Sequence, residues 1–177
     1  LVLGECGHGS RANRWEAPNY LNQSFEYNTI TMVELINNYI RTKRIYLDKS
    51  LNNELVTLHD PCNLVRNGGL LNELRFAVKS SANHFVEMTP HGMDNFCCGG
   101  GGGQLAMSEY NERRLKIGEI KAEQIRKTGA KIVVTPCHNC VDQLSQLNQV
   151  YKLNIKIKTI AELVADALVI NNIETEK

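Results

Sequence analysis

Cysteine is the residue type in this 177-residue chain that is best suited to chemistry. The six cysteines are Cys6, Cys62, Cys97, Cys98, Cys137 and Cys140. Thiolates bind soft metals and iron–sulfur clusters, and paired thiols exchange with disulfides. Because two residues separate Cys137 from Cys140, both sulfurs can face one centre at the start of a helix, where the helix dipole favours thiolate. These types and spacings indicate metal ligation or redox chemistry.

Cys97 and Cys98 are adjacent, and five consecutive glycines follow them. Neighbouring side chains of an extended strand point to opposite faces, so two thiols at one site require an irregular backbone. Glycine reaches positive φ, lets the main chain approach a bulky group, and can direct amide N–H groups at an anion. A cluster of iron and sulfide held by thiolates is such an anion. We therefore expect Gly99, Gly100 and Gly101 to lie against the group that the cysteines hold.

Short apolar runs alternate with longer amphipathic segments, as β–α units do. The runs predict strands over residues 1–4, 55–59, 84–87, 132–135 and 155–158. Helical spacing of apolar residues predicts helices over 32–40 and 160–168, and a long charged helix over 108–128 that ends at Gly129. Residues 10–28 have weak periodicity and predict a long connection with at most one short helix.

Short strands rich in Val, Ile and Leu that alternate with helices imply a mainly parallel sheet with helices on both faces. We predict an α/β fold with three layers and about five strands, as a single domain over residues 1–177. Cys6, Cys62 and Cys137 each follow a predicted strand, at the edge where loops converge and ligands bind in open α/β sheets. A proline directly before Cys62 and before Cys137 fixes the backbone where each strand stops.

The composition disfavours several other classes of protein. Lysine plus arginine (20) nearly balances aspartate plus glutamate (19), and no window is polybasic, so we expect no nucleic acid or anionic lipid as partner. The apolar runs are shorter than the roughly 18–20 residues of a membrane span, and no signal peptide is visible. Because the chain opens in a strand without an initiator methionine, we expect it to be the C-terminal part of a longer protein.

Other interpretations of the same residues stay open. A disulfide framework or a set of inert thiols would use the cysteines without a metal. The glycines would suit a phosphate loop or a flexible loop, although no lysine and hydroxyl residue follow them as in a P-loop. Four thiolates would suit zinc in a non-catalytic module. Cys137 and Cys140 alone would suit a cluster-free thiol oxidoreductase.

The spacing of Cys62, the pair Cys97 and Cys98 before glycine, and Cys137-x-x-Cys140 closely resembles the cysteine-rich CCG domain of heterodisulfide reductase catalytic subunits. Relatives of those subunits include reductase-like subunits of membrane redox complexes in sulfate reducers, and subunits of glycolate and lactate oxidation systems. The resemblance runs from GECGHGSR through HDPCN and FCCGGGGG to TPCHNC and IKTIAELVADAL. It implies that these five thiolates hold a non-cubane [4Fe-4S] cluster.

The resemblance also implies an activity: an oxidoreductase that reduces or forms a disulfide in two one-electron steps. Cys6 lies outside the five-cysteine pattern and is either an extra ligand, a thiol that meets substrate sulfur, or a buried thiol of a strand turn. His59 and His138 are the first candidates for proton donors and His8 the next, while an ordinary structural role stays open for each.

Partners follow from the same resemblance. We expect other redox subunits, including a ferredoxin-like iron–sulfur domain and a membrane cytochrome subunit, together with a disulfide substrate. The expected location is cytoplasmic, with membrane association through partner subunits. The alternative is a domain that only relays electrons in a 2-hydroxyacid oxidation system. Activity toward small disulfides would separate the two.

Overall fold

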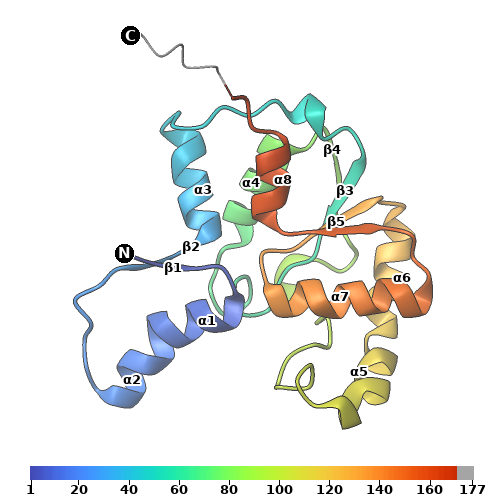
Figure 1. Ribbon diagram of the computed structural model, residues 1–177, viewed down its shortest axis with the longest axis horizontal. Helices are drawn as coiled ribbons and strands as arrows, with labels where there is room; N and C mark the ends of the chain where they lie inside the picture. Colours follow the sequence, from blue (N-terminus) through green and yellow to red (C-terminus); the bar gives the residue numbers. More distant parts are fainter. Residues whose placement is uncertain (171–177) are drawn as a thin grey trace.

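The computed structural model describes residues 1–170 and places its strands in two parallel sheets (Figure 1). The larger sheet has the order β4-β3-β5-β6, built from β3 (Leu55–Leu58), β4 (His84–Val86), β5 (Ile132–Val134) and β6 (Lys156–Lys158). The smaller sheet pairs β1 (Val2–Gly4) with β2 (Thr29–Thr31). The predicted α/β class with a parallel sheet is confirmed.

The first predicted strand differs from expectation in its partner. β1 lies outside the four-stranded sheet and pairs with β2, a strand that the sequence analysis did not predict. The main sheet accordingly has four strands rather than about five. Apolar periodicity indicates that a segment is extended but not which strand it pairs with, and this is the reason for the difference.

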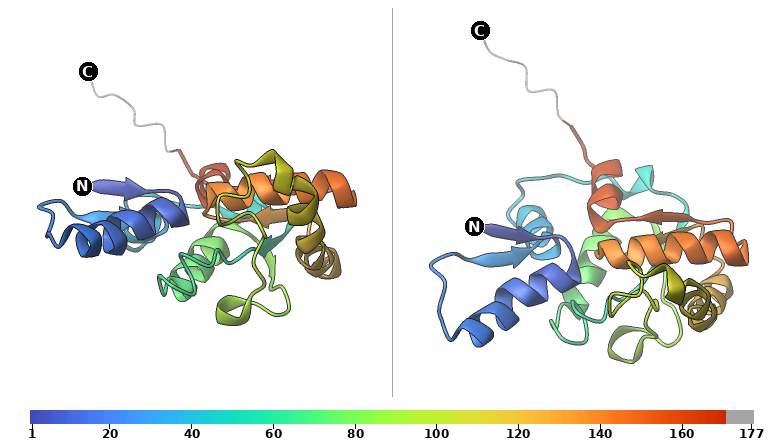
Figure 2. Two further views of the ribbon diagram at one scale, coloured as in Figure 1. Left: turned by 90° about the horizontal axis from the view of Figure 1, so that it is seen from below. Right: turned by 60° about the horizontal axis from the view of Figure 1, so that its bottom comes forward.

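Helices cover both faces of the four-stranded sheet, which gives the predicted three layers (Figure 2). One face packs against α3 (Met32–Arg41), α4 (Leu71–Ser81) and α8 (Ile160–Asp166), and the other against α6 (Glu119–Thr128) and α7 (His138–Tyr151). In β5, Ile132 and Val134 belong to the first core and Val133 to the second. Alternate residues of a strand point to opposite faces, so each core receives its own set.

The long charged helix predicted over 108–128 is two helices in the structure. α5 (Asn111–Ile117) and α6 meet at Gly118, after a short 3₁₀ turn at Ser108–Tyr110. A Cβ on Gly118 would lie 2.6 Å from the Leu147 side chain, so the close approach of α7 requires glycine at the junction. Gly129 ends α6 at φ 68°, which confirms the predicted cap.

The predicted long connection over 10–28 is largely helical. α1 (Gly7–Arg11), π-helical turns at Ala12–Glu16 and α2 (Ala17–Leu21) follow one another directly. Only Gly7 and Ser10 are buried along this stretch, so it has no apolar stripe for a periodicity argument to detect. Two further 3₁₀ turns lie at Lys49–Leu51 and Gly92–Asp94.

The centre of the sheet contains a topological switch point, at which the helices after two neighbouring strands pack on opposite faces. β3 and β5 are neighbours, yet α4 after β3 and α7 after β5 pack on opposite faces. The loops that leave these two strands therefore diverge, and such a point is where open α/β sheets bind ligands. Cys62 follows β3 and Cys137 follows β5. Within residues 1–170, the longest apolar helical stretch is too short to cross a bilayer.

Candidate metal centre

The six cysteines gather at the carboxyl edge of the sheet and are all free thiols. Their sulfurs contact one another in the order Cys62, Cys97, Cys98, Cys140, Cys137, Cys6. Cys98 Sγ lies 3.3 Å from Cys140 Sγ, and Cys6 Sγ lies 3.7 Å from Cys137 Sγ. The fold thus brings together all five predicted ligands, from three separate parts of the chain, with Cys6 beside them.

The start of α7 places two of the sulfurs. Cys137 has extended backbone (φ −138°, ψ 118°) and caps the helix, so α7 begins at His138 and Cys140 lies in its first turn. Both cysteines are buried. The prediction that C-x-x-C stands at the mouth of a helix is confirmed, and the spacing lets both thiols face the loop that carries Cys98.

Hydrogen bonds from the loop after β3 fix the segment that precedes the adjacent cysteines. Arg66 donates to the Asn95 carbonyl at 2.8 Å, and the Gly92 amide donates to Asp60 Oδ2 at 2.6 Å. The Asn95 side-chain amide donates to the Asp60 carbonyl at 2.8 Å. Neither Asp60 nor Asn95 is recognisable as a site residue from the sequence, because only the fold shows that these two loops meet. Together they hold the backbone that leads into Cys97.

Two backbone amides of the glycine run donate to sulfurs of the adjacent cysteines. The Gly99 amide donates to Cys97 Sγ at 3.3 Å, and the Gly100 amide donates to Cys98 Sγ at 3.4 Å. Gly99 has φ +90°, and a Cβ on Gly100 would lie 2.8 Å from Gln143 Cβ in α7. Within residues 1–170, Gly101 donates to no sulfur, and a Cβ on it would lie 4.0 Å from His8 Nε2.

The thiols perturb one another strongly. Hydrogen bonds from Cys62 and Cys98 lower the pKa of Cys97 to about 2. Those from Cys140 and Cys6 hold the pKa of Cys137 well below its usual range, while the pKa values of Cys6 and Cys62 are raised by the same contacts. Each thiolate therefore sits among protonated thiols, because adjacent thiolates repel. Complete deprotonation of the set requires a cationic centre.

This donor set fits an iron–sulfur cluster. Buried cysteine sulfurs converge, amide N–H groups point at two of them, and glycine removes the side chains that would fill the space beside them. Hydrogen bonds to the sulfurs of a cluster tune its potential. The zinc alternative uses four of the thiolates and gives the remaining ones and the glycines no role.

The predicted histidines take different places. His59 is buried, and a ring nitrogen lies within 4.8 Å of the sulfurs of Cys98 and Cys140. Burial and the nearby Lys121 charge lower the pKa of His59 to about 3, so the ring is neutral. The His138 side chain is 55% exposed, and its Nε2 lies 3.2 Å from Glu5 Oε2. Of the two, only His59 lies against the buried sulfurs.

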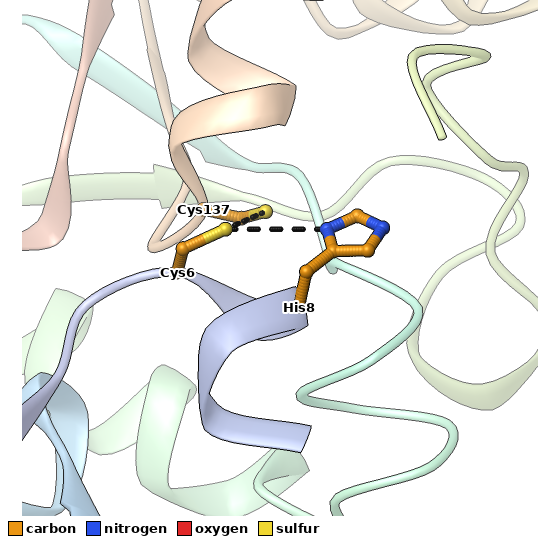
Figure 3. A group of neighbouring side chains, drawn as sticks. All are labelled: Cys6, His8 and Cys137. Carbon is orange, nitrogen blue, oxygen red and sulfur yellow. Dashed lines mark hydrogen bonds between the residues drawn. The ribbon is translucent and has the colours of Figure 1, made fainter. Parts of the chain in front are cut away.

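Cys6 and His8 form the outer side of the site (Figure 3). Cys6 Sγ lies between Cys137 Sγ and His8 Nδ1, at 3.7 and 3.9 Å. His8 Nδ1 also lies 3.4 Å from the side-chain amide of Asn139. Cys6 is half-buried and His8 exposed, so this side faces solvent. The structure therefore places Cys6 beside the five-cysteine set rather than in a separate strand turn.

Known proteins share this pattern. A family model described as CCG, cysteine-rich domain, matches residues 56–145. The iron–sulfur subunit 2 of an Hdr-like menaquinol oxidoreductase from Archaeoglobus fulgidus is 32% identical over 94% of the chain, which covers 30% of that subunit. One subunit of the dihydromethanophenazine:CoB–CoM heterodisulfide reductase from Methanosarcina barkeri is 30% identical over 94% of the chain, which covers 40% of that subunit.

The name of a third relative indicates a different reaction. One subunit of a fumarate reductase (CoM/CoB) from Methanothermobacter marburgensis is 37% identical over 69% of the chain and 22% of its own length. The chain thus spans only 22–40% of the lengths of these three relatives. The match of the family model includes Cys62, the adjacent cysteines and the C-x-x-C. The chain belongs to the CCG cysteine-rich domain family.

Proposed function

We propose that Cys62, Cys97, Cys98, Cys137 and Cys140 hold a non-cubane [4Fe-4S] cluster in an oxidoreductase domain that reduces or forms a disulfide. The observation that carries the proposal is the continuous series of sulfurs, with backbone amides directed at two of them. An ordinary cubane needs four thiolates, and five lie together here. The reductase and quinol-oxidoreductase names of the relatives support a redox role.

Reduction of a disulfide takes two electrons and two protons and yields two thiols. A bound cluster supplies electrons one at a time, so two transfers are needed for each S–S bond. We propose that Cys6, at the solvent side of the site, meets the substrate sulfur. A thiol at this place is close enough to Cys137 to lie beside whatever the five cysteines hold.

The predicted histidines take different roles on the two sides of the site. His138 is exposed and close to Glu5, so we propose that it exchanges protons with solvent and supplies them to the product thiols. His59 is neutral and enclosed, and its place within 4.8 Å of the sulfurs of Cys98 and Cys140 favours a role in positioning them. His8, beside Cys6, is the next candidate for the donor.

The domain would work with partner subunits. The relatives include one named component of a menaquinol oxidoreductase and one of a methanophenazine-dependent reductase. We propose that another redox subunit with ferredoxin-like clusters feeds electrons to this site, and that a membrane cytochrome subunit attaches a cytoplasmic complex to the bilayer. The disulfide substrate is a small molecule or a protein.

The first test is the content of iron, acid-labile sulfide and zinc in protein purified without oxygen, for the wild type and Cys98→Ser. We expect about four irons with equal sulfide in the wild type and a clear loss in the variant. Mössbauer spectra would separate a non-cubane from a cubane cluster through the inequivalence of the iron sites. About one zinc without sulfide would contradict the proposal and leave a structural metal module.

The second test measures reduction of small disulfides by the cluster-loaded protein with a low-potential artificial donor. Turnover that Cys6→Ser abolishes, with iron retained, would support the assigned role of Cys6. A loaded protein that accepts electrons but reduces no disulfide would instead favour the electron-relay alternative.

A further inference from the structure

Two positively charged side chains lie in the interior of residues 1–170 with only neutral hydrogen-bond partners. Lys121 in α6 is 0% exposed and Arg114 in α5 is 1% exposed. Removing a charge from water is strongly unfavourable unless an opposite charge compensates it. Both side chains are therefore expected to face a buried anion that the protein holds when functional.

The partners of Lys121 leave its charge uncompensated. Lys121 Nζ donates to Asn95 Oδ1 at 2.7 Å and to Gln124 Oε1, and it lies 3.8 Å from Met88 Sδ. All three partners are neutral. The ammonium group is thus solvated by amide oxygens and a thioether, which hold it in position without neutralising it.

The nearby carboxylate, Asp60, has a cation of its own. Arg75 binds both of its oxygens, with Nη2 to Oδ2 at 2.8 Å, and the Gly92 amide donates to Oδ2 as well. Arg75 also pairs with Glu87. The negative charge of Asp60 is therefore already offset, and Lys121 needs another counter-charge.

The cysteine sulfurs lie on the other side of the same hydrogen-bond network. The Asn95 amide that faces Lys121 is 3.5 Å from His59 Nδ1, and a ring nitrogen of His59 lies within 4.8 Å of the sulfurs of Cys98 and Cys140. Burial lowers the pKa of Lys121 to about 8, while nearby negative charges, among them Asp60 and the Cys97 thiolate, act in the opposite direction. Lys121 therefore stays positively charged at neutral pH.

Arg114, in α5, lies close to the loop that carries Cys97, Cys98 and the glycines after them. Its guanidinium donates to the side-chain oxygens of Gln143 and Asn111, and Gln143 is the residue that limits the space at Gly99 and Gly100. Two buried cations thus flank the segment that carries the adjacent cysteines. A chance burial of one lysine would not explain this pairing.

We propose that Lys121 is the buried counter-charge of the cluster and raises its reduction potential. The inference rests on the proposed function, because it requires a cluster at the five cysteines. Lys121 touches no cysteine sulfur, so it acts on the cluster through the electrostatic field of its positive charge. Reduction adds a negative charge to the site, and a fixed positive charge in the protein interior stabilises that charge more than it would in water.

The test compares Lys121→Met, which keeps an unbranched side chain one atom shorter and removes the charge, with Lys121→Arg, which keeps the charge. The full protein is purified without oxygen, iron and sulfide are quantified, and the potential of the cluster is measured by a redox titration followed by electron paramagnetic resonance. We expect Lys121→Met to lower the equilibrium constant for reduction of the cluster at least tenfold. For one electron this corresponds to a fall of about 59 mV in the reduction potential. Lys121→Arg should retain most of the wild-type value.

Lys127→Met is the matched control, because Lys127 lies exposed on the same helix and should leave the potential unchanged. Thermal unfolding of cluster-free protein is the second readout. Lys121→Met should be at least as stable as the wild type without the cluster, since the variant no longer buries an uncompensated charge. If Lys121→Met loses the cluster, Lys121→Gln is titrated in its place.

The outcomes are separable. A wild type without iron and sulfide would overturn the proposed function itself. A loaded Lys121→Met, or a loaded Lys121→Gln in its place, with the wild-type potential would overturn only the role of Lys121. Equal destabilisation of the cluster-free and loaded forms with an unchanged potential would assign Lys121 to packing alone.

Discussion

Residues 1–41 and 132–166 follow the same order of elements and yet contribute differently to the site. In each, a strand is followed by a cysteine that caps a helix, then by a parallel strand and a threonine that starts another helix. We call them the N-terminal unit and the C-terminal unit. Their capping cysteines, Cys6 and Cys137, lie 3.7 Å apart between sulfurs, so the two units face each other across the site.

The two units differ in the third residue after the capping cysteine and in the burial of the strand before it. The C-terminal unit has Cys140 there, whereas the N-terminal unit has Gly9. All of β5 is buried between β3 and β6, while β1 pairs only with β2 and has exposed side chains. The same order of elements therefore presents two thiols after a buried strand and a single thiol after an exposed one. The shared order of elements therefore does not decide what each unit contributes; the residue type at this position and the burial of the strand do.

The largest effect is expected when the cysteines of the two units are exchanged for serine. Cys140→Ser should lose most of the bound iron, because Cys140 Sγ lies 3.3 Å from Cys98 Sγ inside the set. Cys6→Ser should keep it, since Cys6 stands at the outer end. Iron and sulfide per chain after anaerobic purification measure both. Equal iron loss would show that the N-terminal unit supplies a sixth ligand and would remove the distinction between the units.

The helices after the two threonines offer a test of burial. Leu35 and Leu163 each lie four residues after the capping threonine, but Leu163 is 0% exposed and Leu35 is only half-buried. Leu163→Ala should cost about 3 kcal/mol or more in unfolding free energy, and Leu35→Ala about 1 kcal/mol. Urea unfolding measures both. Similar losses would indicate that α3 supports the core as strongly as α8 does.

Glycine substitutions probe the space on each side of the site. A Cβ on Gly100 would lie 2.8 Å from Gln143 Cβ, whereas a Cβ on Gly9 would meet no heavy atom within 4 Å. Gly100→Ala should therefore destabilise the fold by about 1–3 kcal/mol and reduce iron retention. Gly9→Ala should be neutral or slightly stabilising, because alanine favours helix over glycine by up to about 1 kcal/mol. Thermal unfolding of the two variants would reveal an unexpected reversal of this order.

The smallest difference is expected at the caps. Thr31 accepts from the Glu34 amide and Thr159 from the Glu162 amide, each in a reciprocal capping box. Thr31→Ala and Thr159→Ala should each lower the free energy of unfolding by about 1 kcal/mol, because in each unit the backbone amide of the glutamate loses its acceptor. Denaturant midpoints of the two variants would be compared directly. A gap of more than about 1 kcal/mol would show that the caps are not equivalent despite their common sequence.

Several features were predictable because they depend on neighbouring residues. The apolar runs at residues 55–59 and 132–135 correspond to β3 and β5, and the C-x-x-C opens α7. The position of Cys62 and Cys137 after parallel strands led to the prediction of one shared edge, and the sulfur contacts agree with it.

Other features depend on contacts between distant segments. The helix of residues 7–21 has almost no buried face, so periodicity could not reveal it. β1 has a strand sequence, but its partner β2 is fixed by the path of the whole N-terminal unit. The burial of Lys121 was equally hidden, because a lysine on a charged helix is normally solvent-exposed.

The sequence by itself determined the parts of the site: which residues are thiols, where strands stop before them, and where glycine permits a close approach of the main chain. These depend on residue type and on spacing within a few positions. Only the tertiary structure decided that Cys6 stands beside Cys137, that Asp60 and Asn95 hold the segment before Cys97, and that Lys121 lies buried behind it. Such contacts join residues tens of positions apart, and packing in three dimensions is what brings them together.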